Sequence, residues 1–155
     1  MGLVKVFKKN NYFTVVATKN ISKGESILKL RGAFSSIPDK YSVQIGEKKH
    51  LFAFSEKPED ESSSFRFLNH SCSPNSFFDM PKGTLVALKD IMENEEIVFH
   101  YCTTEYEMTS PFMCLCGSLN CLNEIKGYKY LSEKNKTELL FQSSPHLKIL
   151  ETEIF

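Results

Sequence analysis

The chain has 155 residues, the size of one ordinary domain, and is long enough to bury a hydrophobic core without many crosslinks. Nineteen basic residues balance nineteen acidic ones, so no overall field attracts the protein to nucleic acid or to an anionic membrane. The sequence contains neither a run of eighteen apolar residues nor a leader-like start, which predicts an unsecreted protein, free of membranes, in the cytoplasm or the nucleus.

The first half of the chain predicts several short strands. Residues 5–7 and 12–17 are rich in β-branched and aromatic side chains, and Asn10-Asn11 between them favours a turn, so we expect an opening hairpin. Residues 26–30 read as the next strand, and residues 41–46 alternate with a period of two. This pattern predicts a mostly β protein.

Residues 55–64 are acidic and rich in serine, which predicts an exposed insert loop that starts near residue 51. Two more strands are expected at residues 84–88 and 96–101. The end of the chain changes character, because residues 134–142 favour a helix and Ser144-Pro145 provides a capping hydroxyl before a first-turn proline. We therefore expect a helical C-terminal tail.

The segment Arg66-Phe-Leu-Asn-His-Ser-Cys-Ser-Pro-Asn75 concentrates short polar side chains, a histidine, a thiol and a proline behind Phe67-Leu68. This arrangement indicates a buried strand that ends in a polar, constrained loop, which is where we expect the chemistry of the protein to lie.

Five cysteines, three of them in the pattern Cys114-x-Cys116-x4-Cys121, favour metal thiolates in a reducing compartment over disulfides. Three thiolates leave a tetrahedral metal one ligand short. Cys72 is one candidate for the fourth ligand, and His70 and Cys102 are the others. If Cys102 is not a ligand, it is best read as a small packed thiol.

Residues 66–75 resemble the R-F-x-N-H-S-C-x-P-N motif of the SET-domain family of protein-lysine methyltransferases, and residues 95–101, Glu-Glu-Ile-Val-Phe-His-Tyr, resemble its E-E-[LI]-x-F-D-Y motif. Residues 114–121 are similar to the zinc-binding post-SET segment. The resemblance implies several small curved sheets with a pseudoknot. It also implies a SET domain over residues 1–108, a post-SET segment over 109–131 and a tail over 132–155.

The resemblance also implies roles for individual side chains. Tyr101 matches the catalytic tyrosine, and Phe99 and Tyr101 match positions of the lysine channel. Contacts to S-adenosylmethionine are implied for Tyr12, Phe13, Thr14, Tyr41, Arg66, Asn69, His70 and Tyr101. Cys72, Cys114, Cys116 and Cys121 match the ligands of a structural Zn²⁺ ion.

The chain departs from the family pattern at three places. Tyr12-Phe13-Thr14 stands where the family usually has Gly-x-Gly, and glycine is the residue that allows the closest approach of a backbone to a ligand. His100 replaces the aspartate of the Asp-Tyr pair. Leu30 replaces a tyrosine that often lines the lysine channel.

The resemblance implies methyl transfer from S-adenosylmethionine to the ε-amine of a lysine in a protein substrate. Phe99, in place of a tyrosine, leaves room for more than one methyl group. The acidic insert favours a basic segment such as a histone tail. The alternative is a catalytically silent SET-like module that binds peptides or serves as a zinc-stapled scaffold. A zinc knuckle for nucleic acid conflicts with the zero net charge, so no direct nucleic-acid or membrane contact is expected, and nothing indicates the oligomeric state.

Overall fold

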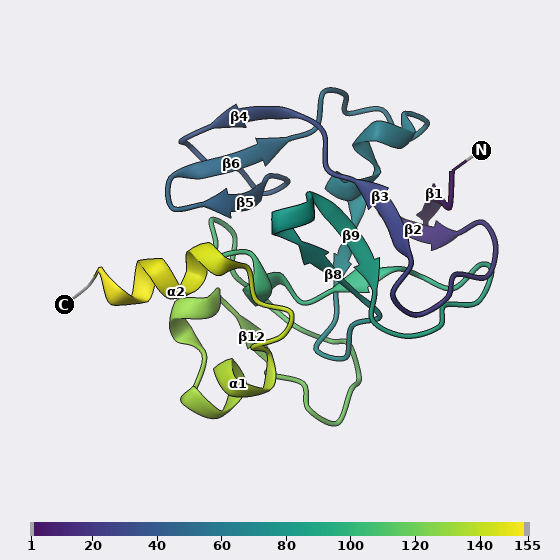
Figure 1. Ribbon diagram of the computed structural model, residues 1–155. Coiled ribbons are helices and arrows are strands. Elements are labelled where there is room, and N and C mark those ends of the chain that lie inside the picture. The colour runs from purple at the N-terminus through teal and green to yellow at the C-terminus, as the bar shows by residue number, and fades with distance from the viewer. Residues whose placement is uncertain (1, 154–155) are drawn as a thin grey trace.

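The computed structural model describes residues 2–153, in which short strands form small two- and three-stranded sheets (Figure 1). The strands are β1 (Val4–Lys9), β2 (Tyr12–Ala17), β3 (Ser26–Lys29), β4 (Ala33–Ser35), β5 (Val43–Gly46), β6 (Lys49–Phe52), β7 (Asn69–His70), β8 (Ser76–Asp79), β9 (Thr84–Ala87), β10 (Val98–Phe99), β11 (Phe112–Met113) and β12 (Glu124–Ile125). The 3₁₀ helices are η1 (Glu61–Phe67), η2 (Met80–Lys82), η3 (Tyr101–Thr103) and η4 (Tyr128–Tyr130), and the α-helices are α1 (Glu133–Glu138) and α2 (Pro145–Thr152). The mostly β architecture with a short helical tail is as predicted.

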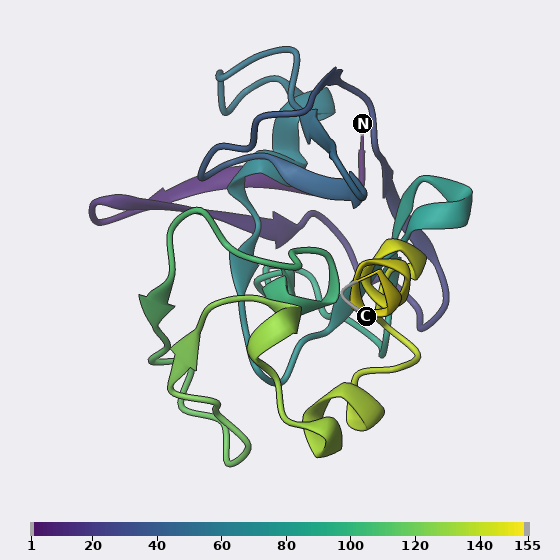
Figure 2. The same cartoon turned by 90° about the vertical axis from the view of Figure 1, so that its left-hand side faces the viewer.

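The predicted opening hairpin is present as the antiparallel pair β1 and β2, with Val4 opposite Ala17 and Lys9 opposite Tyr12. Asn10 turns the chain with a φ of 54°, in the left-handed region that asparagine tolerates better than most residues. Val15 and Ala17 are fully buried. In the turned view of Figure 2, this purple hairpin reaches outward above the green cysteine-bearing segment, on the side of the molecule away from α2.

The main core lies behind the three-stranded sheet β3-β9-β8, which packs against the hairpin and η1. Phe78 and Leu85 are paired across two of its strands and are almost completely buried, together with Phe65 of η1. Burial of one such side chain contributes roughly 1.5 to 3 kcal/mol, so this cluster holds the short strands in place.

Strands β7 and β10 pair in parallel, with Asn69 beside Val98 and His70 beside Phe99. The two motif segments, residues 66–75 and 95–101, are therefore direct neighbours. Only Val98 and Phe99 of the predicted strand 96–101 belong to β10, because the chain turns at His100 into η3.

The acidic insert is less open than its composition suggests. Asp60 accepts the backbone N–H of Ser62 and begins η1, which buries Ser63 and Ser64. The Ser63 hydroxyl accepts the backbone N–H of Ser55, so the serine side chains of this segment replace water as hydrogen-bond partners. Residues 55–60 remain the more exposed part of the insert.

The tail forms two short helices. Ser132 caps α1 by accepting the backbone N–H of Asn135. Ser144 is the N-cap residue of α2, as predicted, but its buried hydroxyl makes no capping hydrogen bond. Leu147 is fully buried where α2 packs on β5.

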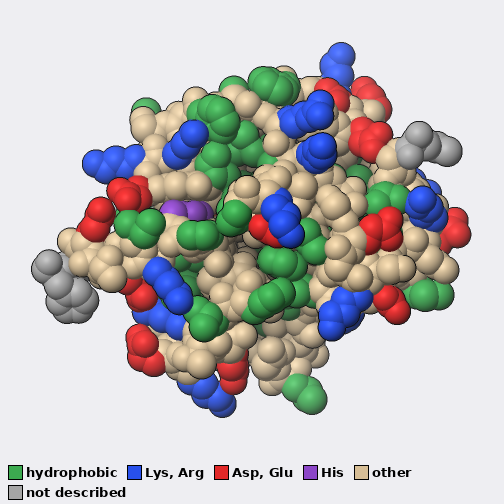
Figure 3. Space-filling model, in the orientation of Figure 1, with side chains coloured by type: hydrophobic (Ala, Val, Ile, Leu, Met, Phe, Trp, Pro, Cys, Tyr) green, Lys and Arg blue, Asp and Glu red, His purple; other side chains and the backbone are tan. Residues whose placement is uncertain are grey.

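Acidic and basic side chains are interspersed on the face shown in Figure 3, and neither sign gathers into one field. Within residues 2–153, the helices are too short and too polar for any of them to cross a membrane.

Candidate active site

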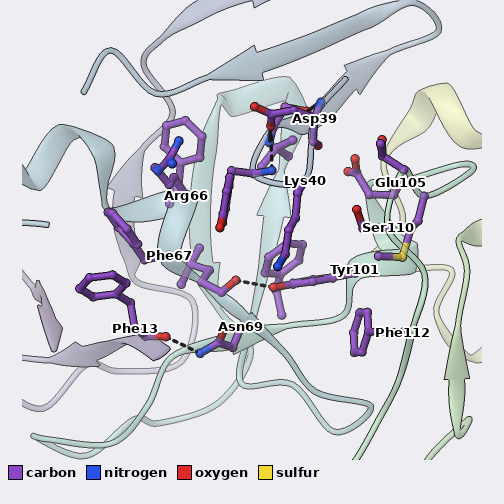
Figure 4. Close-up of a pocket in the computed structure, with 18 of the residues that line it drawn as sticks. Phe13, Asp39, Lys40, Arg66, Phe67, Asn69, Tyr101, Glu105, Ser110 and Phe112 are labelled. Carbon is purple, nitrogen blue, oxygen red and sulfur yellow. Dashed lines mark hydrogen bonds between the residues drawn. The ribbon is translucent and has the colours of Figure 1, made fainter. Parts of the chain in front are cut away.

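A cavity of about 480 Å³ lies between the tip of the hairpin, η1, β7 and the segment that begins with η3 (Figure 4). Seven residues singled out from the sequence line it: Tyr12, Phe13, Tyr41, Arg66, Asn69, Phe99 and Tyr101. Thr14 and His70 are not among its lining residues. Segments that are far apart in the sequence therefore converge on one site.

Asn69 and Tyr101 both line the cavity, and hydrogen bonds fix their functional groups. The Asn69 side-chain amide donates to the Phe13 carbonyl at 2.8 Å and to Glu96 Oε1 at 3.0 Å, which ties β7 to the hairpin. The Tyr101 hydroxyl donates to the Leu68 carbonyl at 2.7 Å. Both functional groups are thus held in fixed positions by the backbone of the elements around them.

Burial, and after it the carboxylate of Glu105, raises the pKa of Tyr101 well above its ordinary value. The phenol therefore keeps its proton at neutral pH and does not act as a base. The ring packs against Phe99 and Phe112, with centroids 4.9 and 5.8 Å away. Tyr101 offers an oriented hydroxyl oxygen in an aromatic, largely dry wall.

Arg66 provides a positive charge at the opposite wall. Its guanidinium lies over the Tyr41 ring at 4.3 Å and approaches Glu56 at 3.6 Å. Arg66 Nε is buried and has no hydrogen-bond partner among the described residues. Because Arg66 lines the cavity, its guanidinium suits a ligand that carries a carboxylate or another acceptor.

The hairpin tip shows how the chain accommodates the missing glycines. Phe13 packs on Phe67, with ring centroids 5.1 Å apart, while its carbonyl accepts the Asn69 amide. The Thr14 side chain is buried away from the cavity, and its hydroxyl has no partner among the described residues. The hairpin tip therefore presents aromatic side chains to the cavity, where the family pattern has glycines without side chains.

His70 lies behind the cavity rather than in it. Its Nδ1 accepts the backbone N–H of Tyr101 at 3.0 Å, and its Nε2 lies 3.3 Å from Cys72 Sγ. Burial, and then the nearby His100, lowers the pKa of His70 to about 3, so its ring is neutral at pH 7. The side chain of His70 thus joins the cysteine cluster to the start of η3.

His100 serves as the N-cap of η3, a position that an aspartate also suits. Its Nδ1 accepts the backbone N–H of Cys102 at 3.3 Å and so caps η3. Burial lowers the pKa of His100 to about 4, which keeps the accepting nitrogen unprotonated. The replacement therefore preserves the cap that begins the turn of Tyr101.

Four cysteines, Cys72, Cys114, Cys116 and Cys121, bring their Sγ atoms to within 4.8 Å of one another. The Cys72 and Cys114 sulfurs are 3.9 Å apart, close to the separation of two thiolates that each bind a tetrahedral zinc ion at about 2.3 Å. The donor set and its spacing fit a closed structural zinc site.

The protonation of the thiols differs around this cluster. Burial raises the pKa of Cys72, whereas for Cys116 burial is outweighed by hydrogen bonds from Ser118, which lower its pKa to about 6. Cys102 lies outside the cluster, and burial raises its pKa to about 12. A second group, His70, Cys72 and His100, also has ligand atoms within 4.8 Å, and it shares Cys72 with the first.

Several cavity residues were not found from the sequence. These are Asp39, Lys40, Glu105, Met108, Ser110 and Phe112. Phe112 and Glu105 follow Tyr101 in a stretch without periodicity, and only the fold shows that it turns back over the cavity. Tyr128 and Tyr130, aromatic residues after the cysteines, do not line this cavity.

Comparison with known proteins agrees with this geometry. The family model described as the SET domain matches residues 12–102. The methyltransferase flvH of Aspergillus flavus is 37% identical over 92 residues, which cover 57% of this chain and 49% of that protein. A histone-lysine N-methyltransferase of Aspergillus oryzae, H3 lysine-36 specific, is 38% identical over 68 residues, or 40% of this chain and 7% of that protein. The matched region thus spans about half of the first relative and a small part of the second.

Two solved structures share the fold. The crystal structure of KRYPTONITE with mCHG DNA and SAH superposes with a TM-score of 0.58 at 22% identity, over 78% of this chain and 28% of that one. The methyltransferase domain of human SETMAR gives a TM-score of 0.57 at 19% identity, over 80% of this chain and 58% of that one. The family model, the fold and the relatives agree that this chain belongs to the SET domain family, whose members among these relatives are methyltransferases.

Proposed function

We propose that the protein is an S-adenosylmethionine-dependent protein-lysine N-methyltransferase. The observation that carries this proposal is the single cavity that joins Asn69 and Tyr101 with Arg66. S-adenosylmethionine has a carboxylate for the Arg66 guanidinium and a flat base for the aromatic wall. When bound, it supplies a methyl group activated by a positive sulfonium.

The side chains of this site align the reactants and exclude water. Arg66, Tyr41 and Asn69 line one wall and would hold the donor there. The Tyr101 hydroxyl, fixed by its bond to the Leu68 carbonyl, would accept weak C–H···O contacts from a bound donor's methyl group. An in-line displacement gains most of its rate from such positioning.

The substrate amine must be neutral before it reacts. With a reference lysine pKa of about 10.4, loss of its proton at pH 7 costs roughly 4 to 5 kcal/mol. The aromatic wall of Phe99, Tyr101 and Phe112 disfavours the charged form by desolvation and so lowers this cost.

The proposed zinc ion has a structural role. Cys72 lies two residues after the end of β7, whereas Cys114, Cys116 and Cys121 lie in the segment that closes the cavity at Phe112. One ion with these four ligands fastens that segment to the strand that bears Asn69. Zinc binding therefore supports the shape of the cavity.

For the substrate we propose a lysine in a basic segment of a protein, with a histone tail as the first candidate, in the nucleus or the cytoplasm. Relatives named as H3 lysine-36 and H3 lysine-4 specific enzymes support this choice. The absence of a hydroxyl on Phe99 supports addition of more than one methyl group. We propose no direct contact with nucleic acid.

One observation favours the alternative, a SET-like module that binds without turnover. The side chains of Tyr12 and Phe13 line the cavity at the place where the family pattern has glycine. A donor that cannot reach the backbone there binds weakly or not at all.

The test combines binding and turnover. Calorimetry measures the affinity for S-adenosylmethionine, and radiolabelled methyl transfer to core histones measures activity, with Tyr101→Phe as the control that keeps the ring and removes the hydroxyl. We expect binding by both forms and transfer by the wild type alone. Binding without transfer to histones or to lysate proteins would instead support the silent module.

A further inference from the structure

Glu105 stands on the cavity wall that faces Asn69 and Arg66, close to Tyr101 and Ser110 (Figure 4). Its Oε2 accepts the backbone N–H of Gln44 at 3.0 Å and the Thr104 hydroxyl at 2.7 Å. Its Oε1 has no hydrogen bond to any described residue. One oxygen of this carboxylate is thus fixed in place, and the other is left for a ligand in the cavity.

The carboxylate also lacks a cationic partner. No ion pair between described residues includes Glu105, and Arg66 stands across the cavity, where it approaches Glu56 at 3.6 Å. Burial raises the pKa of Glu105 to about 7, against the opposing effect of its hydrogen bonds from Thr104 and Gln44. Glu105 is partly buried and has one oxygen without a partner at the cavity, which suits a cation that enters the cavity.

We propose that Glu105 pairs with the ammonium group of the incoming substrate lysine and accepts its proton. This inference rests on the proposed methyltransferase function and adds a proton acceptor to it. The alternative cation is the ammonium group of the methyl donor. It is attached to the same carbon as the carboxylate that we propose lies at Arg66, whereas Glu105 stands on the opposite wall with Tyr101.

The proton and the electrons balance in this scheme. An N–H bond of the ammonium breaks, an O–H bond forms on Glu105, and the electron pair stays on nitrogen. That pair then forms the N–C bond to the methyl carbon, while the C–S bond breaks with its electrons on sulfur. The methylated amine leaves as a cation, and Glu105 returns its proton to solvent.

Other titratable groups near Glu105 do not replace it in this role. Tyr101 keeps its proton, and His146 of α2 donates Nε2–H to the Thr104 carbonyl. Asp39 accepts the backbone N–H groups of Tyr41 and Ser42. Lys40 also lines the cavity, and it forms no ion pair with Glu105.

The first test compares the pH dependence of methyl transfer to core histones in the wild type, in Glu105→Gln and in Glu107→Gln. Gln can still accept the hydrogen bonds of Gln44 and Thr104, and Glu107 is an exposed glutamate two residues away. We expect Glu105→Gln to lower kcat/KM about 100-fold at pH 7. The deficit should close towards pH 10, where the substrate amine deprotonates without help, and affinity for S-adenosylmethionine should not change. Equal pH profiles for Glu105→Gln and the wild type would overturn the proposal.

The second test needs no turnover. The Gln44 amide resonance reports the protonation of Glu105 through its hydrogen bond, and its NMR titration should show a midpoint near pH 7 that Glu105→Gln abolishes. Butylammonium should lower this midpoint in the wild type by about one pH unit, because a cation favours the carboxylate, whereas butanol should not. An unmoved midpoint refutes the pairing even if no histone is methylated. The proposed methyltransferase function would fail by a different result: a wild-type protein that neither binds S-adenosylmethionine nor transfers a methyl group.

Discussion

Replacement of Glu105 by glutamine should change how the stability of the protein depends on pH. The pKa of Glu105 is about 7 in the folded chain and 4.5 at its ordinary value. Between these two pH values the folded state holds a proton that the unfolded state has lost, so the stability of the wild type falls as pH rises through this window. At roughly 1.36 kcal/mol for each pH unit, the loss is at most about 3 kcal/mol, and water that reaches Oε1 reduces it.

Urea unfolding at fixed free zinc between pH 4 and pH 8 measures this effect. His70 and His100 have lowered pKa values and act in the opposite direction, because burial favours their neutral forms. Both are present in Glu105→Gln as well, so they cancel when the two proteins are compared. As the pH rises from 4 to 8, we expect the free energy of unfolding of Glu105→Gln to rise by about 2 to 3 kcal/mol relative to that of the wild type. A constant difference within about 0.5 kcal/mol, the size of an ordinary surface effect, would refute the reasoning about burial of Glu105.

Three further outcomes are expected. Removal of zinc by a chelator should expose the amides of residues 109–131 to hydrogen exchange and weaken methyl transfer. The control Cys102→Ser should keep one zinc ion per chain. Unchanged hydrogen exchange after chelation would show that the ion does not hold the segment. Phe99→Tyr should shift the product towards monomethyl-lysine in mass spectra of a substrate taken to completion, and an unaltered product distribution would contradict the role of Phe99. Arg66→Ala should weaken S-adenosylmethionine binding about 10- to 100-fold in calorimetry, the cost of one or more charged hydrogen bonds, and equal affinity would rule out the contact. Arg66→Lys keeps the charge and loses the planar guanidinium over Tyr41, so its affinity for S-adenosylmethionine should lie between those of the wild type and Arg66→Ala.

The elements that could be predicted from the sequence are those with local signals. Alternating β-branched residues and Asn10-Asn11 indicated the hairpin, and the resemblance of residues 66–75 and 95–101 to known motifs indicated that Asn69 and Tyr101 would meet. Cavity residues such as Glu105 and Phe112 could not be predicted in this way. Their positions depend on a loop that is fixed by hydrogen bonds to Gln44 and by the cysteine cluster, and these are contacts between segments about 40 to 60 residues apart in the sequence.

Two predictions from the sequence were wrong for related reasons. The serine-rich insert reads as solvated, yet Ser63 is buried because its hydroxyl meets the backbone of Ser55. The motif around Tyr101 reads as one continuous strand, yet the ring nitrogen of His100 caps a helical turn and ends the strand early. In both places a side-chain hydrogen bond to the backbone determined the local structure. Neither hydrophobic periodicity nor secondary-structure propensity predicts such a bond.

The two-sided bonding of His70 restricts which side chains position 70 can accept. The Tyr101 amide needs a lone pair on Nδ1, which places the ring hydrogen on Nε2, towards the sulfur of Cys72. An imidazolium has no lone pair to offer the amide, and an aliphatic residue offers neither group. A substitution at this position would therefore disturb the sulfur cluster and the backbone of the tyrosine together, although the two lie on different segments of the chain.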